Sequence, residues 1–166
     1  YMKTTLVMPA YNEEKTIGEV IKKCRMSNVE CSVLVVDDGS KDSTGDRARD
    51  AGAIVVRHPI NRGLGAAIST GLEAALRLHA DVVVTLDADG QHDPADIAAL
   101  IQPIKAGEAD VAIGSRFLKV KSAKCEVRSD GLKCKVPITR KIANRIGNIV
   151  TAMLFGMHVT DSQSGF

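Results

Sequence analysis

An acidic cluster follows one of the apolar runs of this 166-residue chain. Residues 86–94 read LDADGQHDP, with Asp87 and Asp89 two positions apart directly after VVVTL. Carboxylates at i and i+2 leaving a strand can face the same side, and with the amide oxygen of Gln91 they offer the hard oxygen ligands that Mg²⁺ or Mn²⁺ accepts. Such a cation would relieve the repulsion between the acids and neutralise a diphosphate leaving group. Taken alone, the two acids fit a turn or a helix cap equally well, and Asp93 is predicted to cap the helix that follows.

An acidic pair and two arginines could contact a phosphorylated ligand. Asp37 and Asp38 end another apolar run, where they could accept hydrogen bonds from a nucleobase or ribose or could form an Asx turn. Arg116 and Arg140 could each grip a phosphate through planar bidentate contacts, although either one alone is typical of a protein surface. The stretch GLGAA at 63–67 lacks the third glycine of a dinucleotide fingerprint, and the chain has no P-loop motif.

Charge is distributed unevenly along the chain. Residues 116–145 carry ten basic and two acidic side chains, a net charge of +8, while the remainder has a net charge of −6. This segment predicts an anionic partner, either phosphate groups, a membrane surface or nucleic acid, or else a solvated, mobile basic loop at 118–136. Aromatic residues make up only 3% and Trp is absent, so we expect that aromatic stacking does not dominate any site and that there is no nucleic-acid partner.

Cysteine spacing and hydropathy bear on the compartment. The four cysteines lack a C-x-x-C spacing, so we expect reduced thiols rather than a zinc site, in a cytoplasmic protein. No apolar run approaches the ~20 residues that span a bilayer.

Strand-like and helix-like patterns alternate five times, which predicts an α/β fold with a mostly parallel central sheet flanked by helices. The strand at 81–86 is very apolar and is predicted to be central. Because ligands bind at the carboxyl ends of parallel strands, the clusters PAYNE, DDGS, DADGQ and GSRF predict a single site. The predicted strands are 4–10, 31–40, 53–58, 81–86 and 109–117, and the predicted helices are 11–24 with Asn12 as N-cap, 42–52 closed by Gly52, 63–79, 94–107 and 137–156.

The ordered motifs VMPAYNEE, VVDDGSKDST, NRGLGAAISTGLEAA, LDADGQHDP, VAIGSRF and DSQSGF resemble those of the family 2 glycosyltransferases. Within that family they are most similar to the dolichol- and polyprenyl-phosphate sugar transferases. The resemblance covers nearly all of residues 4–166 and implies the GT-A fold, which is Rossmann-like. It also implies one catalytic domain over 1–166, and we expect the protein to continue beyond Phe166, as family members do.

The resemblance also implies roles for individual residues. Asp87, Asp89 and Gln91 match the metal motif, and Asp89 is also implied to be catalytic. Arg116 and Arg140 match arginines near the acceptor phosphate. A further implied acidic position on the acceptor side is Asp161, and the implied lining of the nucleotide pocket is Pro9, Ala10, Tyr11, Glu13, Asp37 and Asp38, with Asp87 at the diphosphate.

The activity that the resemblance implies is an inverting, Mg²⁺- or Mn²⁺-dependent hexosyl transfer. The donor would be GDP-mannose or a UDP-hexose, and the acceptor a polyprenyl or dolichyl phosphate at the cytoplasmic face of a membrane. The basic loop or later segments would hold the protein there as a peripheral protein. Two alternatives stay open, a non-catalytic nucleotide-sugar-binding module and a transferase with a non-lipid saccharide acceptor. An aspartate phosphatase is disfavoured, because its D-x-D motif should follow the first strand and here it follows the fourth.

Overall fold

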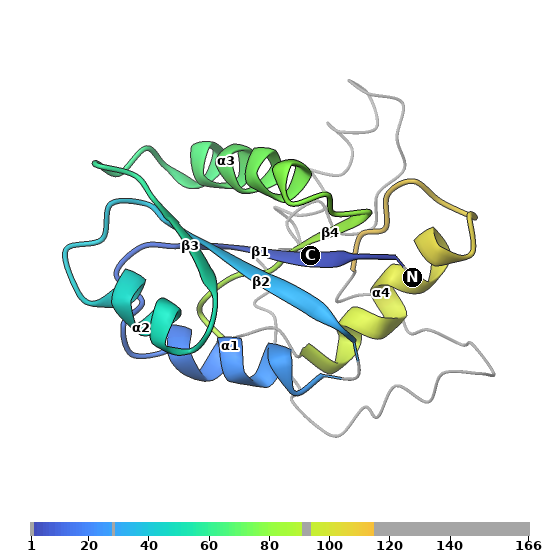
Figure 1. The fold of residues 1–166 in the computed structure, drawn as a ribbon, viewed down its shortest axis with the longest axis horizontal. Helices are drawn as coiled ribbons and strands as arrows, with labels where there is room; N and C mark the ends of the chain where they lie inside the picture. The colour runs from blue at the N-terminus through green and yellow to red at the C-terminus, as the bar shows by residue number, and fades with distance from the viewer. Residues whose placement is uncertain (1, 28, 91–93, 115–166) are drawn as a thin grey trace, which may run out of the picture. The chain divides into compact units, whose positions relative to one another are not determined.

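A four-stranded parallel sheet lies at the centre of the part of the chain that the structure describes (Figure 1). The structure is a computed structural model that describes residues 2–27, 29–90 and 94–114, and those up to Ala112 belong to one compact unit. The strands lie in the spatial order β3-β2-β1-β4, which confirms the predicted α/β fold with a parallel sheet. Their bounds are β1 (Thr4–Ala10), β2 (Cys31–Asp37), β3 (Ile54–Arg57) and β4 (Val82–Thr85).

Helices alternate with the strands and cover both faces of the sheet. Figure 1 shows α3 on one face and α1, α2 and α4 on the other. Among the helices that the structure describes, none combines the length and the apolar character needed to cross a membrane. The predicted loop at 118–136 and helix at 137–156 lie outside the described residues, so the single domain over 1–166 stays a prediction. The helix bounds are α1 (Ile17–Arg25), α2 (Thr44–Asp50), α3 (Leu64–Arg77) and α4 (Ile97–Lys105), with a 3₁₀ turn, η1 (Pro94–Asp96), before α4.

The two middle strands form the core of this unit. Leu6, Val7 and Met8 of β1 are fully buried, and the stretch 33–36 of β2 is at most 4% exposed. Helices on both faces explain why these strands are continuous apolar runs rather than alternating patterns. The buried face of α1 is the one predicted from helical spacing, namely Ile17, Val20, Ile21 and Cys24.

The fourth strand, predicted to be central, has one neighbour in the described sheet, so its central position stays a prediction. β4 pairs with β1 and is an edge strand there, and alternate residues Val83 and Thr85 are partly exposed. Residues 109–114 of the predicted fifth strand are not in a strand, and 115–117 lie outside the described residues. A continuous apolar run indicates that helices cover both faces of a strand. It does not indicate how many strands pair with that strand.

The prediction that Asn12 caps the first helix is wrong. α1 begins at Ile17, with Thr16 in the N-cap position. Asn12 has a φ of +57°, and its side-chain oxygen accepts the backbone N–H of Lys41 at 2.9 Å. The side chain that could have capped the helix therefore binds the neighbouring loop.

The predicted end of the second helix is confirmed, since Gly52 lies just past α2 with a φ of +87° and donates to the carbonyl of Arg49 at 2.8 Å. The Asp93 cap lies outside the described residues, and Asp96 takes the N-cap position of α4.

Two cysteines lie in this unit, and both are free thiols, as predicted. Cys24 is 0% exposed, and burial, with a smaller contribution from nearby Cys31, raises the pKa of its thiol to about 11. Burial also raises the pKa of the half-buried Cys31. The remaining two cysteines lie outside the described residues.

A row of small residues lets α3 approach the sheet closely. Ala67, Gly71 and Ala75 form its buried face. A methyl group on Gly71 would overlap the Cγ1 atom of Val7 and would lie 3.3 Å from a methyl group of Val36. Both neighbours belong to the buried middle strands, so they have little room to move.

Replacing Gly71 with alanine is expected to lower the free energy of unfolding by about 1–3 kcal/mol, the usual cost of overpacking a core. Urea unfolding followed by circular dichroism measures this change. The matched control is Gly65→Ala on the same helix, where an added methyl group meets nothing within 4 Å. That control should be neutral or stabilising by up to about 1 kcal/mol, because alanine favours helix. Equal effects of the two substitutions would contradict the close approach of α3.

Candidate functional site

The loops that follow the strands meet at the carboxyl edge of the sheet. The parallel register sets Ala10 beside Asp37 and Asp37 beside Arg57, so three consecutive strands end side by side. β4 lies on the other side of β1, where Leu86 donates its backbone N–H to the carbonyl of Val7 at 3.0 Å. The predicted convergence is confirmed for the clusters after β1, β2 and β4, while most of the GSRF cluster lies outside the described residues.

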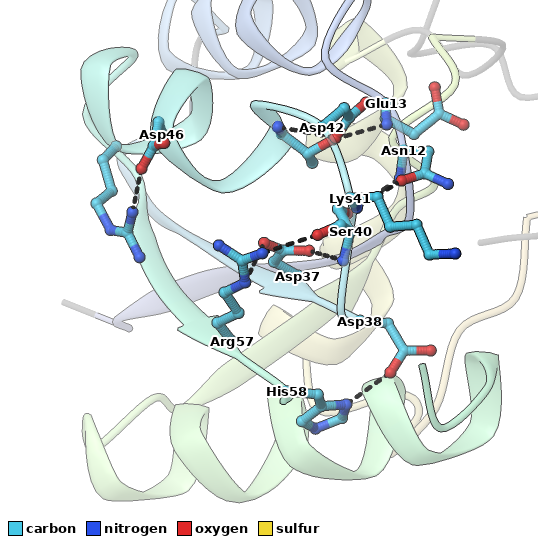
Figure 2. Close-up of polar contacts among 12 residues, drawn as sticks. Asn12, Glu13, Asp37, Asp38, Ser40, Lys41, Asp42, Asp46, Arg57 and His58 are labelled. Atoms are coloured by element: carbon cyan, nitrogen blue, oxygen red, sulfur yellow. Dashed lines mark hydrogen bonds and ion pairs between the residues drawn. The ribbon is translucent and has the colours of Figure 1, made fainter. Parts of the chain in front are cut away.

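Hydrogen bonds join the β1–α1 loop (residues 11–16) to the β2–α2 loop (residues 38–43), and we call these two segments the paired loops (Figure 2). Backbone N–H groups of each segment donate to side chains of the other. Each segment thus supplies acceptors for backbone donors that have no partner in the sheet. The bonds are Asn12 N–H to Ser40 Oγ (3.0 Å), Lys41 N–H to Asn12 Oδ1 (2.9 Å), Glu14 N–H to Asp42 Oδ2 (3.2 Å), Ser43 N–H to Glu14 Oε2 (3.2 Å) and, into the first residue of α2, Glu13 N–H to Thr44 Oγ1 (2.8 Å).

Asp37, the last residue of β2, stabilises the paired loops. Its side chain is fully buried, and Oδ1 accepts the backbone N–H of Ser40 at 2.9 Å. Its other oxygen faces Arg57 Nε at 3.4 Å, an ion pair without hydrogen-bond geometry. Arg57 also donates to the carbonyl of Ser40 at 2.7 Å, as Figure 2 shows. The carboxylate and the guanidinium together fix the position of Ser40.

Asp38 connects the end of β2 to the loop before α3. Oδ1 accepts the backbone N–H of Arg62 at 2.9 Å, and Oδ2 accepts that of Gly63 at 2.8 Å. His58, 5% exposed, lies with Nδ1 2.7 Å from Oδ1 and with Nε2 3.0 Å from the Thr70 hydroxyl. An ionised carboxylate only accepts hydrogen bonds, so Nδ1 carries the proton. Three of the roughly four acceptor positions of the Asp38 carboxylate are therefore occupied within the protein.

These contacts also set the ionisation of Asp38. Burial acts to raise its pKa, since the side chain is only 4% exposed. The hydrogen bonds from His58 and from the two backbone N–H groups outweigh burial, and the pKa of Asp38 lies below its ordinary value. The carboxylate is thus held ionised as a structural acceptor.

The predicted base-pocket residues at the end of β1 lie beside the paired loops. Pro9 and Ala10 end the strand, and Ala10 accepts the backbone N–H of Asp38 at 2.9 Å. Tyr11 is 42% exposed, so this aromatic residue is accessible to a ligand. Glu13 is half-buried, and its carboxylate accepts the Thr16 hydroxyl at 2.8 Å.

Asp87 and Asp89 follow β4 at the same edge. Asp87 is half-buried and Asp89 is exposed, on either side of the buried Ala88, and Gly90 turns the chain with a φ of +77°. Within the described residues no three His, Cys, Asp or Glu side chains gather as a metal site. A carboxylate pair fits a Mg²⁺ or Mn²⁺ ion that completes its shell with water and substrate phosphates, because such ions are usually held by one or two carboxylates.

Four predicted site residues cannot be placed. Gln91, Arg116, Arg140 and Asp161 lie outside the described residues, and their roles stay predictions. Conversely, sequence reasoning missed the acceptor roles of Asn12, Ser40 and Thr44, and the pairing of His58 with Asp38. The available signal was the concentration of hydroxyl and Asx side chains directly after the strands, since these types bind nearby backbone groups.

Comparison with known proteins identifies the family. The model of glycosyl transferase family 2 matches residues 5–157. The chain belongs to this family. Its fold is the predicted GT-A fold, with a parallel four-stranded sheet and flanking helices in the described residues.

Two curated relatives carry names that state an activity. A UDP-N-acetylglucosamine–dolichyl-phosphate N-acetylglucosaminyltransferase of Methanococcus voltae is 38% identical, over 96% of this chain and 66% of the relative. A polyprenol monophosphomannose synthase of Mycolicibacterium smegmatis is 31% identical, over 99% of this chain and 60% of the relative. The chain thus spans about two thirds or less of the length of these relatives.

One solved relative carries ligands. Glucosyl-3-phosphoglycerate synthase from Mycobacterium tuberculosis, in complex with Mn²⁺, UDP-glucose and phosphoglyceric acid, is similar with a TM-score of 0.54 and 33% identity. The similarity covers 64% of this chain and 40% of that one.

The carboxylate of Asp38 is expected to make stability pH-dependent. Its pKa in the folded chain lies below the value of about 3.9 for an unfolded aspartate, so its contribution is present above about pH 4 and is lost as the pH falls through the folded pKa. Asp38→Asn should remove this part of the acid-side loss and should cost about 1–3 kcal/mol at pH 7, because an amide leaves buried donors unpaired. Urea unfolding at a series of pH values measures both.

The control is Asp46→Asn, an exposed residue paired with Arg49 on α2. Its effect should stay within about 1 kcal/mol, as is usual for surface ion pairs. Parallel pH curves for wild type and Asp38→Asn would contradict the bridging position of Asp38.

Proposed function

We propose that this chain is the catalytic part of an inverting, metal-assisted glycosyltransferase that moves a hexose from a nucleotide-diphosphate sugar to a polyprenyl or dolichyl phosphate. One observation carries the proposal: an exposed aromatic ring, the paired loops and the Asp87–Asp89 pair lie at one sheet edge in a family 2 chain. The named activities of the relatives from Methanococcus voltae and Mycolicibacterium smegmatis support a lipid-phosphate acceptor.

The donor base would stack on Tyr11 beside Pro9 and Ala10. Polar atoms of the base or ribose would form hydrogen bonds with groups around Glu13, Asp37 and Asp38. Asp37 and Asp38 already accept hydrogen bonds from the protein backbone. Their main contribution would therefore be to hold in place the loops that line the base pocket. GDP-mannose and UDP-hexoses both fit this description.

The diphosphate would lie at the end of β4. Asp87, Asp89 and Gln91 would hold a Mg²⁺ or Mn²⁺ ion there, and Asp89, the exposed member, would be nearest the leaving group. A divalent cation in this position supplies neutralisation of the charge that develops on the departing diphosphate. The solved relative with Mn²⁺ and UDP-glucose supports this assignment.

The acceptor would approach from the opposite face of the sugar, which inverts the anomeric carbon. A lipid phosphate is already anionic at neutral pH, so its oxygen can attack without a strong general base. Arg116 and Arg140 would orient the phosphate, with Asp161 on the acceptor side. The basic segment 116–145 would attract the anionic headgroup and would hold the protein on the cytoplasmic face of the membrane.

A second acceptor class has one observation in its favour. The solved relative was crystallised with phosphoglyceric acid, which is a phosphorylated acceptor without a lipid. Both acceptor classes present an anionic group to a basic segment, so charge does not separate them. A non-catalytic module, the other alternative, would bind the donor and transfer nothing.

Metal-dependent donor binding is expected in thermal unfolding scans. UDP or GDP should raise the melting temperature by several degrees more with Mn²⁺ than without it, since a ligand at about 100 times its Kd adds about 2.7 kcal/mol to the folded state. Asp89→Asn should abolish the Mn²⁺-dependent part. The control is Asp50→Asn, an exposed aspartate at the end of α2, and it should behave as wild type. Enhancement by Mn²⁺ that survives in Asp89→Asn would rule out the metal assignment.

Sugar transfer is expected to require a lipid phosphate. The protein is incubated with Mn²⁺, with radiolabelled GDP-mannose or UDP-N-acetylglucosamine, and with either polyprenyl phosphate in detergent or phosphoglyceric acid. Label should move into the organic phase only with the lipid. Transfer to the water-soluble acid would favour the second acceptor class, and donor binding without transfer to either would favour the non-catalytic module.

A further inference from the structure

We propose that Asn12 is a positioning residue for the donor base. Asn12 joins the paired loops next to Tyr11 and thereby fixes the backbone that carries the aromatic ring. The inference rests on the proposed function in one respect, namely that a nucleotide base stacks on Tyr11. The hydrogen bonds that carry it stand on the geometry alone.

Asn12 has an uncommon backbone conformation and two bonds to consecutive residues of the other loop. Its φ of +57° lies in the left-handed region, which asparagine tolerates better than most residues. Its backbone N–H donates to Ser40 Oγ at 3.0 Å, and its Oδ1 accepts the backbone N–H of Lys41 at 2.9 Å. Both groups of one residue thus bind a segment 28 to 29 positions away.

The side chain of Asn12 is exposed, so it adds nothing to the buried core. The bonds from Glu13 to the first residue of α2 and between Glu14 and the β2–α2 loop do not involve this side chain and would persist without it. Removing its amide should therefore loosen the part of the β1–α1 loop beside Tyr11 and leave the fold intact.

Tyr11 is restrained on both sides by contacts to the segment after β2. On one side, Ala10 accepts the backbone N–H of Asp38 at 2.9 Å. On the other side is Asn12 with its two bonds. A ring whose backbone is already fixed loses less conformational entropy when a base stacks on it, which favours affinity through preorganisation.

Two substitutions separate the conformation of Asn12 from its side-chain bond. Asn12→Gly keeps access to positive φ and removes the Oδ1 acceptor, whereas Asn12→Asp keeps an acceptor and tolerates the conformation. Isothermal titration with UDP and GDP in the presence of Mn²⁺ gives the Kd. Asn12→Gly should raise the Kd about three- to tenfold, which corresponds to the net contribution of about one hydrogen bond. Asn12→Asp should restore the Kd to within about twofold.

Further measurements distinguish positioning from a general effect on stability. The donor KM of Asn12→Gly should rise with its Kd while kcat stays at the wild-type value, and its melting temperature should change by only a few degrees. Hydrogen exchange of the Lys41 amide should quicken in Asn12→Gly and not in Asn12→Asp. His79→Gly is the matched control, because His79 is the other non-glycine residue of the described chain with positive φ and follows α3. Its Kd should equal that of wild type.

Wild-type nucleotide affinity in Asn12→Gly, or failure of Asn12→Asp to restore it, would overturn the inference and leave the proposed function standing. A Kd that weakens equally in His79→Gly would also overturn it. If the wild-type protein itself binds no nucleotide diphosphate, the proposed function fails, and the inference fails with it.

Discussion

Carboxylates that accept backbone N–H groups hold the carboxyl edge of this sheet together. Where parallel strands end, the chain must turn, and its N–H groups lose their partners in the sheet. Asp37, Asp38 and Asp42 accept such groups from residues 40, 62, 63, 14 and 44. For Asp38 and Asp42 these hydrogen bonds outweigh burial and keep the pKa below its ordinary value. These carboxylates therefore act mainly as acceptors for backbone groups of the protein itself.

This arrangement separates two kinds of acid at one edge. Asp38 is buried and bonded to backbone groups, whereas Asp89 is exposed after β4. A buried carboxylate with several donors contributes rigidity, and an exposed one is accessible to a cation that also contacts an anionic substrate. Under the proposed function, the buried carboxylates would hold the loops that line the donor site, and the exposed carboxylate would help to bind the metal ion.

Much of the fold follows from local patterns in the sequence. The buried face of α1 was predicted from helical spacing, and the end of α2 from Gly52, because both depend on neighbours along the chain. The convergence of the loops followed from the geometry of parallel strands. The position of β4 at the edge of the described sheet was not predictable in this way, since helices bury a strand's faces whether or not it has a second neighbour.

The site was less predictable than the fold. Asp87 and Asp89 are proposed as metal ligands because their spacing is visible in the sequence. Asn12 was assigned to a helix cap, since asparagine favours caps and nothing in the sequence marks a partner 29 positions away. The contact between His58 and Asp38 likewise joins residues 20 positions apart without any periodic signal. The acceptor residues of the implied site lie outside the described part of the chain.

Because Cys24 is buried, labelling of its thiol can report on opening of the fold. This is useful in a chain without tryptophan, whose fluorescence commonly follows unfolding. Alkylating reagents attack the thiolate, and burial raises the pKa of this thiol to about 11, so in the native state it is both covered and protonated at neutral pH. Modification of Cys24 must therefore wait for α1 to leave the sheet. The half-buried Cys31 provides an internal reference of the same chemistry. The ratio of the two labelling rates reports how often α1 opens.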